Sequence, residues 1–388
     1  MFTIYSLNKL KKEFLDSLKS RYARANQKNK ISNIYKKNFN YYEKNISYAG
    51  METWLDSLDE KLFFEDALLI LEKLHSENDL IQFKEDLLYS IKNNFRDEDY
   101  RFNLIENSQL SIKELKSNIL LIIKELDSFL SSINIDFIAN NNSDFYSKTN
   151  GKPSKLGLDT KLIKIKIPKS KLIQINEAEK ELSINWKYGY DLYKSLTNKI
   201  VIISSPDLVS YSHFTEFGIS YINVIDRDLF ETIDDLVHEN SHHHLNLIIK
   251  KYKLLKNVND NRVFYSPWRQ SLRSTYAILH SVFTFSYGAL LFENILNNPS
   301  PFMKNNLERV AFRFLEESMM LTYSLHDLQQ VETNFYKKGI SILNVLLKQN
   351  KNAKLKLNSA NKLIKSKLYK KRLSELENNL KIAIKIYR

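Results

Sequence analysis

Hydrophobic positions in the first 145 residues recur with the three- and four-residue spacing of amphipathic helices, and charged residues fill the positions between them. The pattern predicts four helices, at Leu7–Ala25, Met51–His75, Asp79–Asn93 and Leu110–Ile133. A polar run at 140–144 and the Gly-Lys-Pro at 151–153 predict a linker after them. We therefore expect residues 1–150 to form a helical N-terminal region.

Between about residues 160 and 225 the pattern changes to short segments that favour β-strands. Residues 162–167 alternate with period two, and 182–186, 199–203 and 219–224 are short apolar or β-branched runs. We expect two or more of them to pair into a small sheet whose last strand leads through Asp226 into the next helix. The edge of such a sheet can offer backbone groups to an extended peptide.

Residues 228–252 have the strongest helical pattern of the chain. Asp228 and Glu231 have the spacing of a capping box, which predicts that a helix begins here. Apolar residues follow as a 3-4 stripe, and His238 and His242 occupy the stripe beside it. We expect both histidines to point toward the interior or the lip of a cavity.

The remaining pattern predicts a helical C-terminal part. Residues 265–269 include Pro267 and indicate a loop that enters a helix at 271–296, which is apolar nearly all round and therefore central to the core. Further helices are expected at 302–324, 326–348 and 358–387. The predicted fold class is mostly α with a small β-sheet (α+β). Its metal-binding catalytic domain is expected at 158–350 and a basic C-terminal helix or tail at 351–388.

Composition narrows the classes of site and partner. The absence of cysteine excludes disulfides, thiolate nucleophiles and cysteine-based metal sites. The net charge is +13, yet residues 351–388 alone hold twelve Lys or Arg against Glu375 and Glu377, and the rest is nearly balanced. This distribution argues against nucleic acid as the partner, because the basic excess lies in one terminal segment.

Two further patterns bear on location. Residues 1–10 contain no apolar signal-peptide core, so we expect a cytoplasmic protein. Residues 274–292 hold no Asp, Glu, Lys or Arg, but their histidine, serines, threonine and tyrosine suit a buried helix better than a lipid-facing span. We therefore expect no membrane insertion.

His238, Glu239 and His242 form an HExxH motif, the arrangement in which two histidines at i and i+4 bind one metal ion. The alternative is a polar helix face without a metal. A catalytic site needs a third protein ligand, and His280 is the first candidate. On its own, His280 would rather be a core histidine bonded to a backbone carbonyl. Three carboxylates are the other candidates: Glu293, Glu316 and Glu317.

Arg269 and Arg273 precede His280 by 11 and 7 residues. A guanidinium makes two parallel hydrogen bonds to a carboxylate, which suits an anionic co-substrate that chelates the metal. A surface salt bridge is the alternative role for either arginine.

The ordered set of HExxH, Ser266-Pro267-Trp268-Arg269, Arg273 and Ile278-Leu279-His280 resembles the HExxH-type 2-oxoglutarate-dependent peptide β-hydroxylases. These enzymes accompany biosynthetic clusters for ribosomally made, modified peptides. Residues 14–21 also resemble the N-terminal helical segment of that family.

The resemblance implies an Fe(II) enzyme that binds 2-oxoglutarate, activates O₂ and hydroxylates a β-carbon in a precursor peptide. His238 and His242 would be iron ligands and His280 the third. Arg269 or Arg273 would anchor the distal carboxylate of 2-oxoglutarate, and Glu239 would orient a ligand imidazole or a bound water.

Two other functions remain open from the residues. In a zinc metallopeptidase, Glu239 would be the general base on a zinc-bound water. In a non-catalytic protein, the basic tail would bind a peptide or nucleic acid. We expect instead that the tail, if functional, holds an acidic leader peptide of the substrate. No oligomeric state is predicted.

Overall fold

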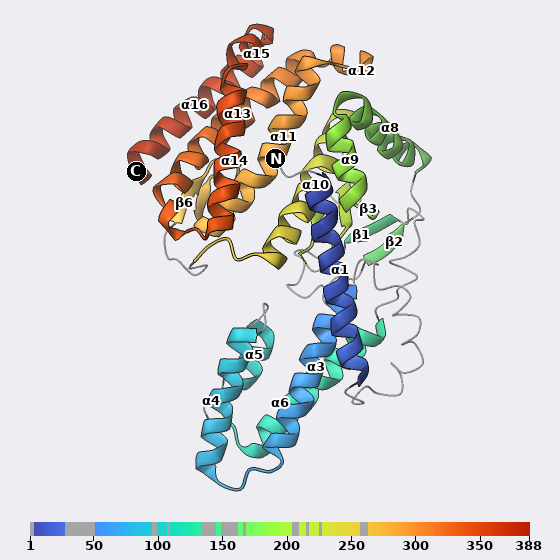
Figure 1. The fold of residues 1–388 in the computed structure, drawn as a ribbon, viewed down its shortest axis with the longest axis vertical. Helices are drawn as coiled ribbons and strands as arrows, with labels where there is room; N and C mark the ends of the chain where they lie inside the picture. The colour runs from blue at the N-terminus through green and yellow to red at the C-terminus, as the bar shows by residue number, and fades with distance from the viewer. Residues whose placement is uncertain are drawn as a thin grey trace. The chain divides into compact units, whose positions relative to one another are not determined.

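A computed structural model describes residues 4–27, 51–94, 99–106, 109–132, 145–148, 162–165, 168–203, 209–214, 217–224, 227–256 and 263–388 (Figure 1). The described residues are mostly helical and include a small sheet and a hairpin, which confirms the predicted α+β class. The chain divides into two compact units. Unit 1 comprises Met1–Phe14, Ser143–Ser147 and Lys164–Arg388, and unit 2 comprises Leu15–Asn142 and Lys148–Ile163.

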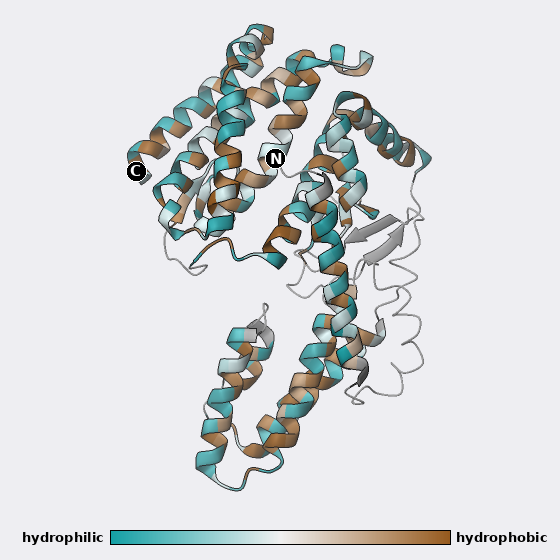
Figure 2. Ribbon diagram, in the orientation of Figure 1, coloured by the Kyte–Doolittle hydropathy of each residue, from teal (hydrophilic) through white to brown (hydrophobic). Residues whose placement is uncertain are grey.

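Unit 2 is built from amphipathic helices whose apolar and polar stretches alternate along the ribbon (Figure 2). Its core includes Phe64, Ile91 and Ile119, which are fully buried. The four predicted helices are confirmed with small shifts at their ends, and α5 was not predicted. The helices of this region are α1 (Ile4–Gln27, which begins in unit 1), α3 (Met51–Leu71), α4 (Glu77–Asn94), α5 (Asp99–Ile105) and α6 (Ile112–Ser132).

The sheet has the strand order β2-β1-β3-β5-β4. β1, β3 and β5 run parallel, while β4 is an antiparallel edge strand. β5 is buried throughout and β3 nearly so, as expected for parallel strands covered by helices. The predicted runs at 199–203 and 219–224 therefore pair in one sheet, as expected. The strands are β1 (Phe145–Lys148), β2 (Leu162–Ile165), β3 (Lys199–Ile203), β4 (Tyr211–Ser212) and β5 (Ile219–Asn223).

The helix predicted at 228–252 is α10, Leu229–Lys251, and it packs against β4, β5 and three helices of unit 1. Its predicted capping box is confirmed. The Asp228 carboxylate accepts a hydrogen bond from the Glu231 backbone N–H at 2.9 Å, and the Glu231 carboxylate accepts one from the Asp228 N–H at 3.1 Å.

The strand predicted at 182–186 is wrong, since 182–185 form the end of helix α8, Lys169–Asn185. Ile175, Ala178, Leu182 and Asn185 are buried at three- and four-residue spacing, so the longer helical stripe overrides the short apolar run. α9 (Lys187–Leu196) follows directly. The linker predicted at 140–144 and 151–153 lies outside the described residues, as do Asp226 and the end of the alternating segment at 166–167.

The prediction of a loop entering a helix at 271 is also wrong, because residues 263–274 form a β-hairpin. β6 (Val263–Ser266) and β7 (Ser271–Ser274) pair antiparallel around a four-residue turn that begins at Pro267. Gln270 adopts a left-handed conformation (φ 49°), and its N–H donates to the Ser266 carbonyl at 2.7 Å. Pro267 was the sequence signal for this turn, whereas the left-handed conformation of Gln270 could not be predicted from hydrophobic periodicity.

Helix α11 (Thr275–Asn297) is the central helix of unit 1 and packs against α10 and α13. It is long and apolar enough to cross a membrane, but 67% of its most apolar stretch is buried, as expected of a core helix. The predicted break near 325 is wrong, because α13 continues to Gln330, and the helix predicted at 358–387 is divided at Ile364–Ser366. The remaining helices are α12 (Pro301–Lys304), α13 (Leu307–Gln330), α14 (Lys337–Lys354), α15 (Leu357–Leu363) and α16 (Lys367–Tyr387).

Both chain ends pack into unit 1, which differs from the predicted boundaries at 1–150, 158–350 and 351–388. Leu7 and Leu10 belong to the core of unit 1, and Ile364 is buried in the same core. Leu380 and Ala383 of α16 pack against α13. Helical periodicity identifies each helix but not the core it joins, and residues 351–388 pack as part of unit 1.

Candidate metal site

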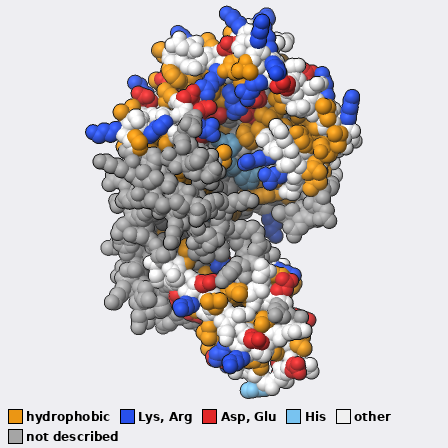
Figure 3. Space-filling view, turned by 180° about the vertical axis from the view of Figure 1, so that it is seen from behind, with side chains coloured by type: hydrophobic (Ala, Val, Ile, Leu, Met, Phe, Trp, Pro, Cys, Tyr) orange, Lys and Arg blue, Asp and Glu red, His pale blue; other side chains and the backbone are white. Residues whose placement is uncertain are grey.

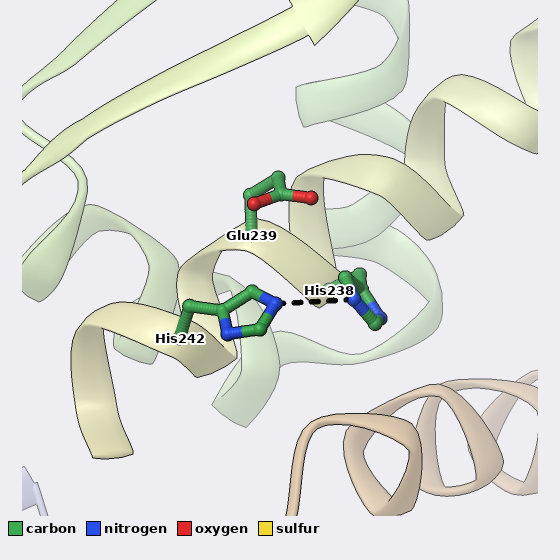
Figure 4. Close-up of side chains that lie close together, drawn as sticks. All are labelled: His238, Glu239 and His242. Atoms are coloured by element: carbon green, nitrogen blue, oxygen red, sulfur yellow. Dashed lines mark hydrogen bonds between the residues drawn. The ribbon is translucent and has the colours of Figure 1, made fainter. Parts of the chain in front are cut away.

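His238 and His242 lie one turn apart on α10, with their Nε2 atoms 3.2 Å apart (Figure 4). Two nitrogens that each bind one ion at about 2.1 Å, at octahedral or tetrahedral angles, lie roughly 3.0–3.4 Å apart. Both imidazoles are half-buried, so they form part of a surface that a small molecule can reach. The pair therefore has the spacing that a single divalent cation requires.

Both imidazoles are neutral at neutral pH. Burial lowers the pKa of His238 to about 4, with a further lowering by the positive charges of Arg269 and Arg313. Burial also brings the pKa of His242 well below its usual value, helped by the neighbouring histidines and by Arg269. Because a metal ion binds the neutral imidazole, no proton has to be displaced for these two ligands to bind.

Glu239 is 2% exposed, and one of its oxygens lies within 4.8 Å of ligand nitrogens of both histidines. Its carboxyl group projects from α10 in a different direction from the imidazoles (Figure 4). Burial raises the pKa of Glu239 to about 8, and Oε2 has no hydrogen-bond partner among the described residues. This buried oxygen with spare hydrogen-bonding capacity is what a group that orients or deprotonates a bound water needs.

His280 projects from α11 toward the pair. Its ring centroid lies 5.2 Å from that of His242, with 29° between the planes. It lies outside the tight group of His238, Glu239 and His242. No hydrogen bond is seen from its ring to the described residues, which does not favour the alternative of a core histidine bonded to a carbonyl. The structure thus brings His280 beside the pair without placing it at ligand distance.

The three alternative carboxylates are engaged elsewhere. Glu293 pairs with Lys356 at 2.7 Å, Glu316 pairs with Arg313 at 2.5 Å, and Glu317 pairs with the same Arg313 at 2.9 Å. None of them joins the histidine group among the described residues. His280 therefore remains the first candidate for a third ligand.

Arg269 lies in the hairpin turn, and its charge lowers the pKa of both His238 and His242. Its side chain makes no ion pair with a described residue. Both arginines are exposed, but Arg273, on β7 opposite Phe264, is not among the charges that shift the pKa of His238. Figure 3 shows histidine side chains in a recess on one face, with Lys and Arg side chains beside them. The structure thus brings Arg269, and not Arg273, into electrostatic reach of the histidine pair.

The two extra histidines of α10 point into the core. His243 Nδ1 accepts a hydrogen bond from the Gly218 N–H at 3.3 Å, and its Nε2 lies 3.1 Å from Ser220 Oγ. His244 Nδ1 is hydrogen-bonded to the Tyr287 hydroxyl. Both side chains are fully buried. The helix register is therefore the predicted one, with His238 and His242 together on the accessible face.

The sequence analysis did not predict the residues that pack behind His238, which are Phe285, Trp268 and Glu317. The Trp268 indole stacks on Phe285, whose ring lies 4.8 Å from that of His238, and Trp268 Nε1 donates to Glu317. The available signal was the position of Glu317. It takes one place in the buried 3-4 stripe of α13 that also contains Phe314 and Leu321.

No protein-family model matches this chain, and no curated protein matches it. The chemistry of the site follows from its own donor set: three neutral imidazoles, one buried carboxyl group and one guanidinium without an ion pair to a described residue. Imidazoles and a carboxylate bind zinc or iron in its divalent state, and a guanidinium binds a carboxylate or another oxyanion. The group can hold one divalent cation together with an anionic molecule.

Proposed function

We propose that this chain is an Fe(II)- and 2-oxoglutarate-dependent oxygenase that hydroxylates the β-carbon of a residue in a ribosomally synthesised precursor peptide. The observation that carries the proposal is Arg269, whose guanidinium has no ion pair with a described residue and whose charge acts on both metal-spaced imidazoles. A positive charge there opposes binding of a bare cation. It favours a cation that arrives together with a dicarboxylate.

In this proposal His238 and His242 hold the iron and His280 turns toward it as the third ligand. When bound, Fe(II) with 2-oxoglutarate supplies the activation of O₂ that attack on an unactivated carbon requires. The guanidinium of Arg269 binds the distal carboxylate of 2-oxoglutarate through two parallel hydrogen bonds. Glu239 orients a ligand imidazole or a water molecule from the buried side of α10.

The peptide would lie along β4, the antiparallel edge strand. Ser210 Oγ donates to Asp235 at 2.7 Å, and Ser212 Oγ donates to the Glu239 carbonyl at 3.2 Å, so β4 is fixed beside the histidine pair. An extended peptide that adds to a sheet edge gains backbone hydrogen bonds while its side chains project toward the adjoining site. This supports a peptide as the substrate.

The partner is a precursor peptide whose leader segment is acidic, in a cytoplasmic setting. Lys367, Lys370 and Lys371 of α16 are exposed, while the opposite side of the helix is packed. Electrostatic attraction to an acidic leader would be lost on charge reversal. Substituting all three lysines by Glu should weaken precursor binding in fluorescence anisotropy, more at low salt than at high salt. Unchanged affinity at low salt would remove the leader from this surface.

The test is turnover of a precursor peptide with Fe(II), ascorbate, 2-oxoglutarate and O₂. We expect one succinate for each peptide that gains one oxygen atom, as measured by mass spectrometry, and no reaction without 2-oxoglutarate. Peptide cleavage under zinc, independent of 2-oxoglutarate, would contradict the proposal.

A zinc metallopeptidase is the second candidate, and a specific observation favours it. Glu239 lies next to the histidine pair with a carboxyl oxygen that has no partner among the described residues, as a general base for a zinc-bound water requires. The antiparallel edge strand suits a peptide substrate for either activity. The turnover experiment separates them, because only the oxygenase consumes 2-oxoglutarate.

A further inference from the structure

The hairpin turn that bears Arg269 is attached to helix α13 through one hydrogen bond. Trp268 Nε1 donates to Glu317 Oε2 at 2.9 Å. Glu317 is 1% exposed, so the bond is shielded from water. A hydrogen bond to a carboxyl group that is shielded from water is stronger than an exposed one. Because Trp268 directly precedes Arg269, this bond limits where the guanidinium can lie.

The same indole ring supports a metal-spaced histidine. Its plane lies on the Phe285 ring with a centroid distance of 4.6 Å and an angle of 6°. Phe285 in turn lies 4.8 Å from the His238 ring, at 58°. Packing on both sides limits the rotamers that Phe285 can adopt. A continuous set of contacts therefore runs from Glu317 through Trp268 and Phe285 to His238.

Glu317 is also part of an ion cluster that reaches α10. Arg313 pairs with Glu317 at 2.9 Å and with Asp234 at 3.1 Å, one turn before His238. Burial raises the pKa of Glu317 to about 7, while Arg313 and the Trp268 hydrogen bond oppose that rise. Burying a carboxylate costs free energy that an apolar residue here would avoid. Glu317 is instead bonded to Trp268 and Arg313, which indicates a role other than packing.

We infer that Glu317 is the positioning residue of this site. Its carboxylate holds the Trp268 indole, and the stacked Trp268–Phe285 pair then fixes both the His238 imidazole and the turn that bears Arg269. Glu317 contacts the turn through Trp268 and reaches α10 through Arg313, and the inference concerns the contact with Trp268. The inference rests on the proposed function for the identity of the anion that Arg269 binds.

The first measurement needs no metal or co-substrate. The chain has three Trp residues, and the indole N–H signal of Trp268 is identified by its loss in Trp268→Phe. Glu317→Ala should shift this signal and speed its exchange with solvent, since its acceptor is gone. Glu317→Gln keeps an acceptor oxygen and should retain protection. Glu316→Gln is the matched control, because Glu316 pairs with the same Arg313 but has no hydrogen bond to Trp268.

The second measurement is calorimetric binding of Mn(II), and then of 2-oxoglutarate to the Mn(II) protein. Loss of a partner that orients a metal ligand costs roughly 10–100-fold in affinity or activity. We expect Glu317→Ala and Trp268→Phe to weaken 2-oxoglutarate binding by about tenfold or more, and Mn(II) binding by about tenfold. Glu317→Gln and Glu316→Gln should stay within about threefold of the wild type, since neither removes the indole acceptor.

The outcomes separate the inference from the proposed function. If the wild type binds neither Mn(II) nor 2-oxoglutarate, the proposed function fails. If the wild type binds both and Trp268→Phe binds them equally well, the inference fails alone. Trp268→Phe decides the matter even where Glu317→Ala does not fold, since it leaves the Arg313–Glu317 ion pair intact. Thermal unfolding of each variant verifies that it is folded.

Discussion

Helix α10 presents histidines on two faces, and their surroundings differ. His243 and His244 are fully buried and hydrogen-bonded to protein groups of β5, its preceding turn and α11. His238 and His242 are half-buried, and the hydrogen bond seen for their rings is the one to each other. The fold thus engages both ring nitrogens of His243 and Nδ1 of His244, whereas the Nε2 atoms of His238 and His242 contact each other.

The difference indicates where function lies. A buried polar group that the fold needs is satisfied by the fold, as His243 is by Gly218 and Ser220. His238 and His242 keep two nitrogens 3.2 Å apart, and Glu239 keeps a buried oxygen without a partner among the described residues. Spare capacity in adjacent groups marks a site for a ligand that the protein does not itself provide.

The largest effect should come from His238→Ala or His242→Ala. Each removes one of the two nitrogens at ligand spacing. Loss of a group that only orients a metal ligand lowers metal affinity by up to about 100-fold, so loss of the ligand itself should lower it by more. Stability of the metal-free protein should change by less than about 1 kcal/mol, since neither ring satisfies a buried group of the fold. Metal titration and urea unfolding of the same samples check both statements.

His280→Ala sharpens the assignment of the third ligand. If His280 turns toward the ion, its loss should weaken Fe(II) binding by about 10–100-fold and abolish turnover. Anaerobic titration with Fe(II) provides the measurement. Full affinity and stoichiometry in this variant would place the third ligand elsewhere.

His243→Ala should give the opposite pattern. It leaves the Gly218 N–H and the Ser220 hydroxyl without their buried partner, so the free energy of unfolding should drop by about 2–4 kcal/mol. Metal stoichiometry of the folded protein should remain that of the wild type. Loss of metal with unchanged stability would remove the distinction between the two faces.

The two arginines should differ in their effect on the co-substrate. Arg269→Ala should weaken 2-oxoglutarate binding by about 10–30-fold, the equivalent of about 1.5–2 kcal/mol for a charged hydrogen-bonding group. Arg273→Ala, at an exposed position outside reach of the histidines, should leave it within about twofold. Calorimetry on the Mn(II) protein compares them. Equal values for both variants would remove Arg269 from its assigned role.

An effect of similar size to that of Arg269→Ala concerns pH and Asp235, which accepts a hydrogen bond from Ser210, the residue before β4. Burial raises the pKa of Asp235 to about 6, above its ordinary 3.8. The protonated form is therefore favoured by folding, and this contribution to stability is complete below about pH 4 and lost as the pH rises through about 6. The free energy of unfolding of the wild type should therefore fall by about 2 kcal/mol more between pH 4 and 7 than that of Asp235→Asn. Urea unfolding of the metal-free proteins at both pH values measures it, and equal slopes would contradict it.

The sequence was most informative where a feature is local. The capping box at Asp228 and Glu231 and the spacing of His238 and His242 are set within one helix, so periodicity and motif located them correctly. The hairpin that bears Arg269 was missed, because its turn depends on one proline and on the left-handed conformation of Gln270.

Contacts between elements distant in sequence were not predictable from spacing. Glu317 was considered a possible metal ligand, whereas it is bonded to Trp268, 49 residues earlier. His280 was the first candidate for a third ligand, but spacing along the chain could not show its contact with His242, which depends on how α11 crosses α10. Such pairings depend on tertiary packing, which residue periodicity along a helix does not encode.

The most direct test of the account is metal analysis of anaerobically purified wild-type, His242→Ala and His243→Ala proteins, each after loading with Fe(II) and removal of excess metal. We predict one iron per chain in the wild type and in His243→Ala, and none in His242→Ala. Iron bound equally by His242→Ala, or no iron bound by the wild type, would contradict the assignment of the accessible histidine face of α10 as the metal site.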